Sequence, residues 1–188
     1  VTFADICYAS NPSYTNVPDD NFEQALIDLG YDDTLDDYVV TDSISGVTNL
    51  NVSSKSISDL TGIEDFTALT RLYCQDNQLT SLDMSANTAL TELFCNNNQI
   101  TALDVSSNTA LTRLNCDGNS LTSLDVNNNT ALNELRCTDN QLTTLDVSAN
   151  TALTNYLDCS YNQLSSLDIS SNTALIKLAC QGNQLTSL

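Results

Sequence analysis

The sequence predicts an α+β solenoid that is mostly β, closed at its N-terminus by a helical cap. Three features recur in register. Cysteines are 21 residues apart, with one step of 22, at Cys74, Cys95, Cys116, Cys137, Cys159 and Cys180. Asparagines keep the same spacing at Asn77, Asn98, Asn119, Asn140, Asn162 and Asn183, as do apolar residues at Leu79, Ile100, Leu121, Leu142, Leu164 and Leu185. Self-similarity at a fixed period of this length indicates a coil of stacked turns.

One full turn, from Leu90, reads "LTELFCNNNQITALDVSSNTA". Leu90, Leu93, Cys95 and Ile100 are expected to point inward, each leucine or isoleucine adding roughly 1.5 to 3 kcal/mol when fully buried. No single turn encloses that surface alone, so neighbouring turns share it and the two ends need caps. Asn98 and its equivalents are expected to turn inward and satisfy backbone groups where each strand ends.

Each turn divides into two halves of the same form, "LTELFCNNNQ" and "ITALDVSSNTA". We therefore expect an extended segment on both sides of the coil, with no helix on the outer side. The alternation of Leu103 and Val105 in the second half supports a strand-like geometry over a helical one. Asp104 and Phe94 fall at matching outward positions of the two halves.

The pattern L-x-x-L-x-C-x-x-N-x-I resembles the leucine-rich repeat family, from about Val47 to Leu188. The resemblance implies a right-handed coil whose first-half strands stack in parallel along a concave face. The first turn, from Val47, has 22 residues, with Val52 for cysteine and Lys55 for asparagine, and is similar to the internalin form of the repeat. We expect a tail and helical cap over residues 1–46 and about seven turns over 47–188, the last one incomplete.

The cap is predicted from "VPDDNFEQALIDLGYDDTLDDYVV". Asp20 and Glu23 form a capping-box-like start, and Gly30 is a suitable terminator. The apolar residues on one face are Phe22, Leu26 and Leu29. A short amphipathic helix is therefore expected to cover the open end of the first turn.

Composition excludes several partners. The chain of 188 residues has 24 acidic and 5 basic residues and no histidine, a net charge of -19. Such a surface repels phosphates and anionic lipids, so neither nucleic acid binding nor membrane insertion is expected. There is no apolar run of about 18 residues and no signal-like start. Because the chain begins at Val1, we expect a processed or trimmed product, from which an export signal could have been removed.

The chain stops in mid-turn at "QLTSL". An open solenoid edge exposes strand backbone and apolar side chains. Either the protein continues past Leu188, which we favour, or two copies associate end to end there.

The cysteines are expected to be reduced core thiols, because they lie in a line and lack the close paired spacing of a zinc site. Disulfides between neighbouring turns and metal ligation are the alternatives. Cys7 lies outside the series and is expected to be a free thiol. Without histidine, and with its thiols buried away from a base, the chain is expected to have no catalytic site, cofactor or metal and not to be an enzyme.

Two acidic features could bind cations. The loop "YDDTLDDY", residues 31–38, lacks the glycine and terminal glutamate of an EF-hand, so a solvated turn is favoured over a calcium site. The repeated aspartates are Asp83, Asp104, Asp125, Asp146 and Asp168. Hydrogen bonding of each carboxylate to the turn that follows is favoured. A calcium ladder and an unpaired repulsive stripe are the alternatives.

Outward positions of the first-half strands form the candidate binding face, because the scaffold positions hardly change while these do. Its residues are Arg71, Tyr73, Glu92, Phe94, Arg113, Asn115, Glu134, Arg136, Tyr156, Asp158 and Lys177. Four of the five basic residues lie here and the fifth, Lys55, is expected at the edge. The extra residue in "LTNYLDC" is expected to bulge the strand near Tyr156, and Tyr161 joins the candidate site.

Two interpretations of this face remain open. Alternating charges on adjacent strands can neutralise each other with little effect beyond the surface. Exposed aromatic rings beside arginine are the residue types that carry binding energy in interfaces. We favour recognition, and a non-enzymatic module of a secreted or cell-surface bacterial protein that binds a protein. A carbohydrate or adhesion module, and a structural spacer in a larger surface protein, are the alternatives.

Overall fold

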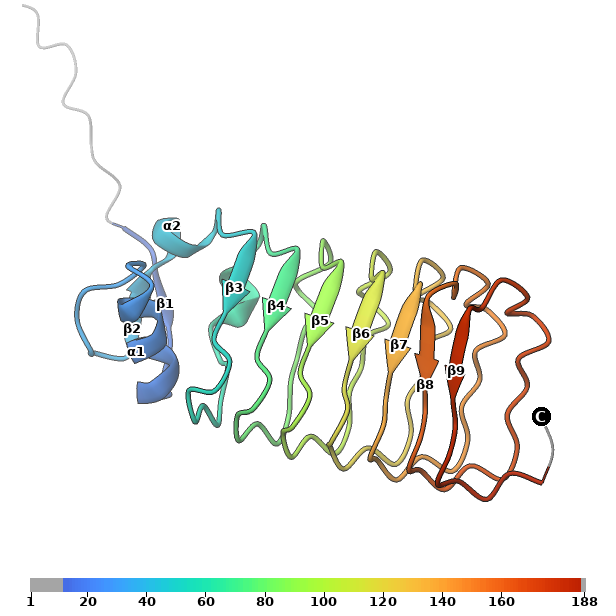
Figure 1. Ribbon diagram of the computed structural model, residues 1–188. Coiled ribbons are helices and arrows are strands. Elements are labelled where there is room, and N and C mark those ends of the chain that lie inside the picture. Colours follow the sequence, from blue (N-terminus) through green and yellow to red (C-terminus); the bar gives the residue numbers. More distant parts are fainter. Residues whose placement is uncertain (1–11, 187–188) are drawn as a thin grey trace, which may run out of the picture.

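The computed structural model describes residues 12–186, which form one coil with a cap at its N-terminal end (Figure 1). Seven short strands form a single parallel sheet in sequence order. They are β3 (Asn49–Asn51), β4 (Arg71–Tyr73), β5 (Glu92–Phe94), β6 (Arg113–Asn115), β7 (Glu134–Arg136), β8 (Tyr156–Asp158) and β9 (Lys177–Ala179). The predicted solenoid of about 21-residue turns is confirmed.

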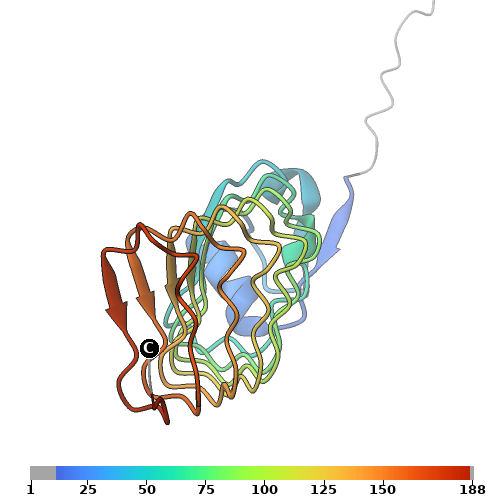
Figure 2. The same cartoon turned by 90° about the vertical axis from the view of Figure 1, so that its right-hand side faces the viewer.

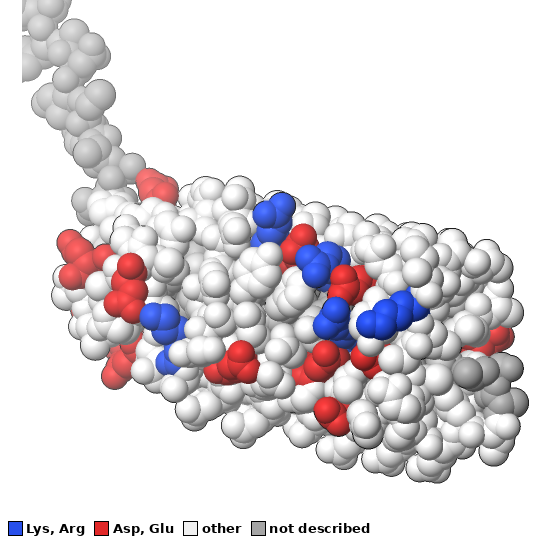
Figure 3. Space-filling model, in the orientation of Figure 1, with Lys and Arg blue, Asp and Glu red and all other residues white. Residues whose placement is uncertain are grey.

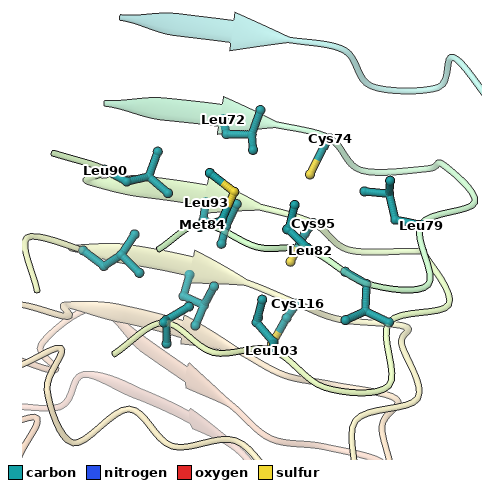
Figure 4. Packing of buried hydrophobic residues seen from close by; sticks show 14 of the residues in the cluster. Leu72, Cys74, Leu79, Leu82, Met84, Leu90, Leu93, Cys95, Leu103 and Cys116 are labelled. Carbon is teal, nitrogen blue, oxygen red and sulfur yellow. The ribbon is translucent and has the colours of Figure 1, made fainter. Parts of the chain in front are cut away.

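The core is a stack of identical layers, one per turn. Leu90, Leu93, Cys95 and Ile100 have no exposed surface, as predicted, and their equivalents in neighbouring turns lie directly above and below them (Figure 4). Each strand places its middle leucine opposite that of the next, for example Leu93 opposite Leu114. Stacking therefore buries a column of apolar side chains that no isolated turn could enclose.

Asparagines join the turns where the strands end. The side-chain oxygen of Asn98 accepts from the backbone N–H of Leu79 at 3.0 Å, and its amide donates to the carbonyls of Cys74 and Cys95. The same pattern recurs at Asn119, Asn140, Asn162 and Asn183. The predicted role of these side chains is confirmed.

A second asparagine column, which the sequence analysis did not identify, lies on the other side of the coil. Its members are buried, and the amide of each donates to two backbone carbonyls of the preceding turn. They are Asn87, Asn108, Asn129, Asn150 and Asn172. They bind the convex side of each turn to its neighbour, as the first column binds the strand side.

The convex side is made of turns. Between Phe66 and Thr186 the described chain contains no helix, and its one bridge there outside the named strands joins Asp83 and Asp104 in parallel. Viewed from the C-terminal end, the turns overlie one another with the sheet along one side (Figure 2). Leu103 and Val105 point inward, as expected.

The repeated aspartates close those turns. Asp104 accepts from the backbone N–H of Ser106 at 2.8 Å, and the other four bond the residue two positions on in the same way. The hydroxyl and the backbone N–H of Ser106 hold the pKa of Asp104 below its ordinary value. The favoured turn-capping role is therefore present in every turn of the series.

The cap consists of β1 (Tyr14–Asn16), α1 (Asp20–Asp28), β2 (Tyr38–Val40) and α2 (Thr41–Ile44), with a 3-10 turn η1 (Ile63–Asp65) in the first repeat. Strands β1 and β2 pair antiparallel. Gly30 ends α1 in the left-handed region, with φ of 80°, as predicted. None of the helices in the described residues is long and apolar enough to cross a membrane.

Helix α1 begins one residue earlier than expected. Asp19, and not Asp20, is its N-cap, and its Oδ1 accepts from the N–H groups of Asn21 and Phe22 at 3.0 Å. Its Oδ2 accepts from Ser58 and Asp59 of the first repeat, so one carboxylate caps the helix and fastens the cap to the coil.

Two other details of the predicted helix were wrong. Glu23 does not close a capping box. It is fully buried and its Oε1 accepts from the N–H groups of Asp36 and Tyr38, which shapes the acidic loop. Leu29 is exposed because it stands at the C-cap, where the chain turns away from the core, whereas Phe22 and Leu26 are fully buried.

The extra residue of the turn before β8 does not disturb the sheet. Glu134 pairs with Tyr156 and Arg136 with Asp158 in unbroken register, so the expected bulge is absent. The extra length falls between Leu153 and Tyr156, ahead of the strand, where a surface turn absorbs it.

Candidate functional site

The outward side chains of β4 to β9 form one continuous surface, which we call the sheet face. It carries the predicted residues Arg71, Tyr73, Glu92, Phe94, Arg113, Asn115, Glu134, Arg136, Tyr156, Asp158 and Lys177. Basic and acidic side chains alternate along it (Figure 3). Since the strands are three residues long, each contributes two outward side chains, and the middle leucine or its equivalent faces the core.

Five of these residues form a connected chain of ion pairs. Arg71 Nε lies 3.8 Å from Glu92, and Arg113 Nη1 lies 3.6 Å from the same carboxylate. Arg113 Nε and Arg136 Nε lie 3.2 and 2.8 Å from Glu134. The parallel register places Glu92 between Arg71 and Arg113 of the two adjacent strands, and Glu134 beside Arg113 of β6. Glu134 also pairs with Arg136 of its own strand, so each of the two glutamates contacts two guanidinium groups.

The two signs of charge differ in exposure. The side chains of Glu92 and Glu134 have 18% and 14% of their surface exposed, whereas those of Arg71, Arg113 and Arg136 have 51%, 39% and 41%. The carboxylates therefore lie beneath the guanidinium groups. What this part of the sheet face presents to solvent is mainly cationic.

An aromatic cluster lies beside the ion pairs. The rings of Tyr73 and Phe94 stack with centroids 5.2 Å apart, and the guanidinium of Arg113 lies 5.0 Å from the centre of the Phe94 ring. Tyr73 donates its hydroxyl hydrogen to Glu92 at 3.0 Å. The expectation that Phe94 stands freely exposed was wrong, because its neighbours cover part of the ring and leave it half-buried.

A second cluster surrounds Tyr156. Its hydroxyl donates to Asp158 at 2.6 Å, and Arg136 and Lys177 lie 5.1 and 4.0 Å from the ring centre. The hydrogen bond to Asp158, with burial and the negative charge there, raises the pKa of Tyr156 to about 12. Because Arg136 also pairs with Glu134, it connects the two clusters.

Tyr161 lies just after β8 in an unusual backbone conformation. Its φ is 52°, and every turn of the ladder has a left-handed residue at this position: Asp76, Asn97, Gly118, Asp139, Tyr161 and Gly182. Aspartate, asparagine and glycine tolerate that region, and a bulky side chain does so at a cost. The Tyr161 ring is exposed and packs over Gly182, where an added Cβ would come within 2.5 Å of it.

Asp117 is a residue of this region that the sequence analysis missed. It follows β6 and its Oδ1 accepts from the backbone N–H of Thr138 at 2.6 Å. Burial, opposed by that hydrogen bond and reinforced by the charge of Asp158, raises the pKa of Asp117 to about 6. An aspartate occurs at this position in one turn of the ladder only, so the periodic pattern gave no signal for it.

Two further residues named in the sequence analysis, Lys55 and Asn115, have structural contacts. Lys55, which follows β3 in the first repeat, pairs with Asp28 of α1 at 2.8 Å and so contacts the cap. Asn115 accepts from the N–H of Asp117 and shapes the end of β6.

The thiols of the ladder are free, and all but the half-buried Cys180 are buried. Burial raises the pKa of Cys95 to about 12. Among the residues described, no group of three or more histidine, cysteine, aspartate or glutamate side chains is arranged to hold a metal ion. Cys7 falls outside the described range.

No protein-family model matches the chain. A curated relative, Internalin J of Listeria monocytogenes serotype 4b, is 40% identical over 71 residues, which are 38% of this chain and 8% of that protein. The chain thus spans less than a tenth of the length of that relative.

Solved structures match over nearly the whole chain. A functional domain of InlJ from Listeria monocytogenes, which includes a cysteine ladder, aligns with 94% of this chain and 45% of its own, with a TM-score of 0.79 and 38% identity. An internalin of the same species, InlF, aligns with 96% of this chain and 62% of its own, with a TM-score of 0.71 and 23% identity, and so shares the fold. The chain is therefore a cysteine-ladder leucine-rich repeat protein and a homologue of Internalin J.

Proposed function

We propose that the chain is a non-enzymatic binding module of a secreted or cell-surface bacterial protein, and that it recognises a protein partner through the sheet face. In this proposal, residues 47–188 form the binding unit and residues 1–46 supply its cap. The similarity of the chain to a functional domain of InlJ supports the proposal that it is a binding module.

The observation that carries the proposal is the cluster of Tyr73, Phe94 and Arg113. A stacked aromatic pair beneath a guanidinium group stands on an open sheet, at positions that other turns fill with Asn115, Arg136 or Ala179. The scaffold does not need these side chains, since the other turns fold without them. Aromatic rings and arginine are the side chains enriched in the energetic centres of protein interfaces.

Catalysis has little support from the same residues. The chain has no histidine to act as a base near pH 7. Burial raises the pKa of the thiols of Cys74, Cys95, Cys116, Cys137 and Cys159, so these five form very little reactive thiolate at that pH. The outward carboxylates Glu92 and Glu134 are each occupied by two arginines. These groups fit a recognition surface better than a reaction centre.

The experiment compares two double variants on arrays of proteins and of glycans. Phe94→Ala with Arg113→Ala removes one large apolar and one basic side chain from the sheet face. The matched control, Leu35→Ala with Lys55→Ala, removes one apolar and one basic side chain from the exposed surface of the cap and of the adjoining first repeat.

Binding of a protein by the wild type and the control, with loss of at least about tenfold in the sheet-face variant, is the expected result. If the chain bound only glycans, the carbohydrate alternative would replace protein recognition. Equal binding by both variants would contradict a role for the sheet face and would favour a spacer.

A further inference from the structure

The arginines of the sheet face leave most of their terminal N–H groups without a protein partner. The hydrogen bonds of Arg113 and Arg136 to Glu134 both use Nε. Within the described residues, the terminal nitrogens of Arg71, Arg113 and Arg136 donate no hydrogen bond, and only Nη1 of Arg113 lies near a carboxylate, 3.6 Å from Glu92. A guanidinium group with a free terminal edge is suited to bidentate contact with a carboxylate.

These side chains are also held in place before any ligand arrives. Glu134 contacts the Nε groups of Arg113 and Arg136, and Glu92 lies 3.6 Å from Nη1 of Arg113. The rings of Phe94 and Tyr156 lie 5.0 and 5.1 Å from the guanidinium carbons of Arg113 and Arg136. An arginine that is already oriented loses less side-chain freedom on binding. The half-buried carboxylates of Glu92 and Glu134 thus orient the guanidinium groups and leave them exposed.

The rest of the molecule is acidic, in contrast to the exposed arginines of the sheet face. The chain carries a net charge of -19, and its one basic residue outside the sheet face, Lys55, is paired with Asp28. An acidic ligand is repelled by the cap, by the acidic loop and by the aspartates of the convex side. The row of Arg71, Arg113, Arg136 and Lys177 is the surface where it meets exposed cations (Figure 3).

From these observations we infer that the sheet face binds an acidic, extended segment of its protein partner, with carboxylates on the exposed guanidinium edges and an apolar side chain against Phe94. This inference rests on the proposed function and names the chemistry of the partner. Arg71 and Arg113 stand two strands apart, about 10 Å at the usual strand spacing. Carboxylates three residues apart on an extended chain span about the same distance.

The test measures binding of fluorescent synthetic peptides to the purified chain by anisotropy. One peptide has glutamate at every third position with serine between and one central tyrosine. A second replaces each glutamate by glutamine, and a third replaces each by lysine. Oligogalacturonate, an acidic glycan, is the competing probe. The test variant is Arg113→Gln with Arg136→Gln. The control, Lys55→Gln, removes one basic side chain away from the sheet face and leaves the row of Arg71, Arg113, Arg136 and Lys177 intact.

We expect the glutamate peptide to bind the wild type and Lys55→Gln equally and to lose at least about tenfold in affinity for the double arginine variant. The glutamine and lysine peptides are expected to bind at least about tenfold more weakly than the glutamate peptide. Circular dichroism of the double variant controls for folding, since the turns and core do not depend on these surface side chains.

Several results would overturn the inference: equal binding of the glutamine peptide, tighter binding of the lysine peptide, no loss in the double arginine variant, or strong binding of oligogalacturonate alone. A last outcome is that none of the peptides binds while the protein array still shows that Phe94→Ala with Arg113→Ala abolishes binding of a protein. In that case the inference fails and the proposed function stands.

Discussion

The side-chain oxygen of Asn140 accepts a hydrogen bond from the backbone N–H of Leu121, at 2.9 Å, across 19 residues of chain. Its amide group donates to the carbonyls of Cys116 and Cys137 at 3.0 and 3.2 Å. One buried side chain thus satisfies backbone groups of two successive turns, which no backbone partner reaches at that corner of the coil.

Asn140→Ala is therefore expected to lower the free energy of unfolding by about 2 to 3 kcal/mol, because it leaves buried donors and acceptors unpaired. Chemical denaturation measures the change. Asn127→Ala makes the same substitution at an exposed position and should alter stability by less than about 0.5 kcal/mol. Equal losses in the two variants would show that the interturn hydrogen bonds do not matter.

Asp19 offers a second comparison between neighbouring residues. Burial opposes its ionised form, but hydrogen bonds from Ser58, Phe22 and Asp59 outweigh this and hold the pKa of Asp19 below its ordinary value. Asp19→Ala should cost about 2 kcal/mol, since it removes both the N-cap and the attachment of α1 to the first repeat. Asp20 is exposed and follows Asp19 in the chain, so Asp20→Ala should lower the free energy of unfolding by only about 0.5 kcal/mol. Thermal unfolding of the two variants measures the difference.

Replacing Tyr161 is expected to stabilise the protein. Tyr161→Asn places a side chain that tolerates φ of 52° where tyrosine is strained, and should raise the free energy of unfolding by about 1 kcal/mol. The reciprocal change, Asn97→Tyr, introduces the same strain at the matching position and should lower it by a similar amount. If Tyr161→Asn proved destabilising, the contact of its ring with Gly182 would outweigh the backbone strain.

Asp117 should make the stability depend on pH. Its folded-state pKa is raised from 3.8 to about 6, so the folded chain binds this proton more tightly than the unfolded chain. The stability it contributes is fully present below pH 3.8 and is lost as pH rises through about 6. Asp117→Asn should therefore stabilise the protein at pH 7.5, on the order of 1 kcal/mol allowing for solvent screening, and have little effect at pH 3.5.

Asp104→Asn provides the control of opposite sign. Hydrogen bonds from Ser106 lower the pKa of Asp104, so its contribution is present above pH 3.8 and lost as pH falls through the lowered value. This variant should be less stable than the wild type at pH 7.5, and the difference should shrink in acid. Thermal unfolding of both variants across this range would contradict the assignment if they shifted in the same direction.

Ladder thiols should resist alkylation in the native state. Since the thiolate is the reactive species, the pKa of about 12 at Cys95 leaves very little of it at pH 8. In a Cys7→Ser background, iodoacetamide should modify Cys180, which is half-buried, well before Cys95. Peptide mass spectrometry reads the order. Comparable rates in the folded protein, or cysteine pairs that resist alkylation even after denaturation, would exclude the reduced buried ladder.

The period predicts much of the fold because every turn repeats one solution to the same packing problem. Cysteine, leucine and asparagine positions follow from it, and so do the outward residues of the sheet face. The second asparagine column shares that periodicity and could have been found: Asn108 recurs as regularly as Asn98. Its burial depends on how the convex side closes, which the spacing alone does not reveal.

The features that the repeat period could not predict are those found in a single turn. Choosing Asp19 over Asp20 as the N-cap depends on the position of Ser58, which is far along the chain. The shielding of Glu92 beneath two arginines depends on rotamers at the sheet face, not on spacing. The burial of Asp117 and the placement of the extra residue before β8 likewise reflect local three-dimensional fit at a single turn.

Within residues 47–186, each turn is hydrogen-bonded to the turns before and after it by strand pairs, by two asparagine columns and by N–H groups such as that of Cys95, which donates to the carbonyl of Asn115. Pulling on the two ends of such a coil loads the same set of bonds at every junction, in series. The module should therefore yield by peeling, one turn of about 21 residues at a time from an end, while the remaining turns keep their shape. Under shear, a partner held on the middle strands would be the last to lose its binding surface.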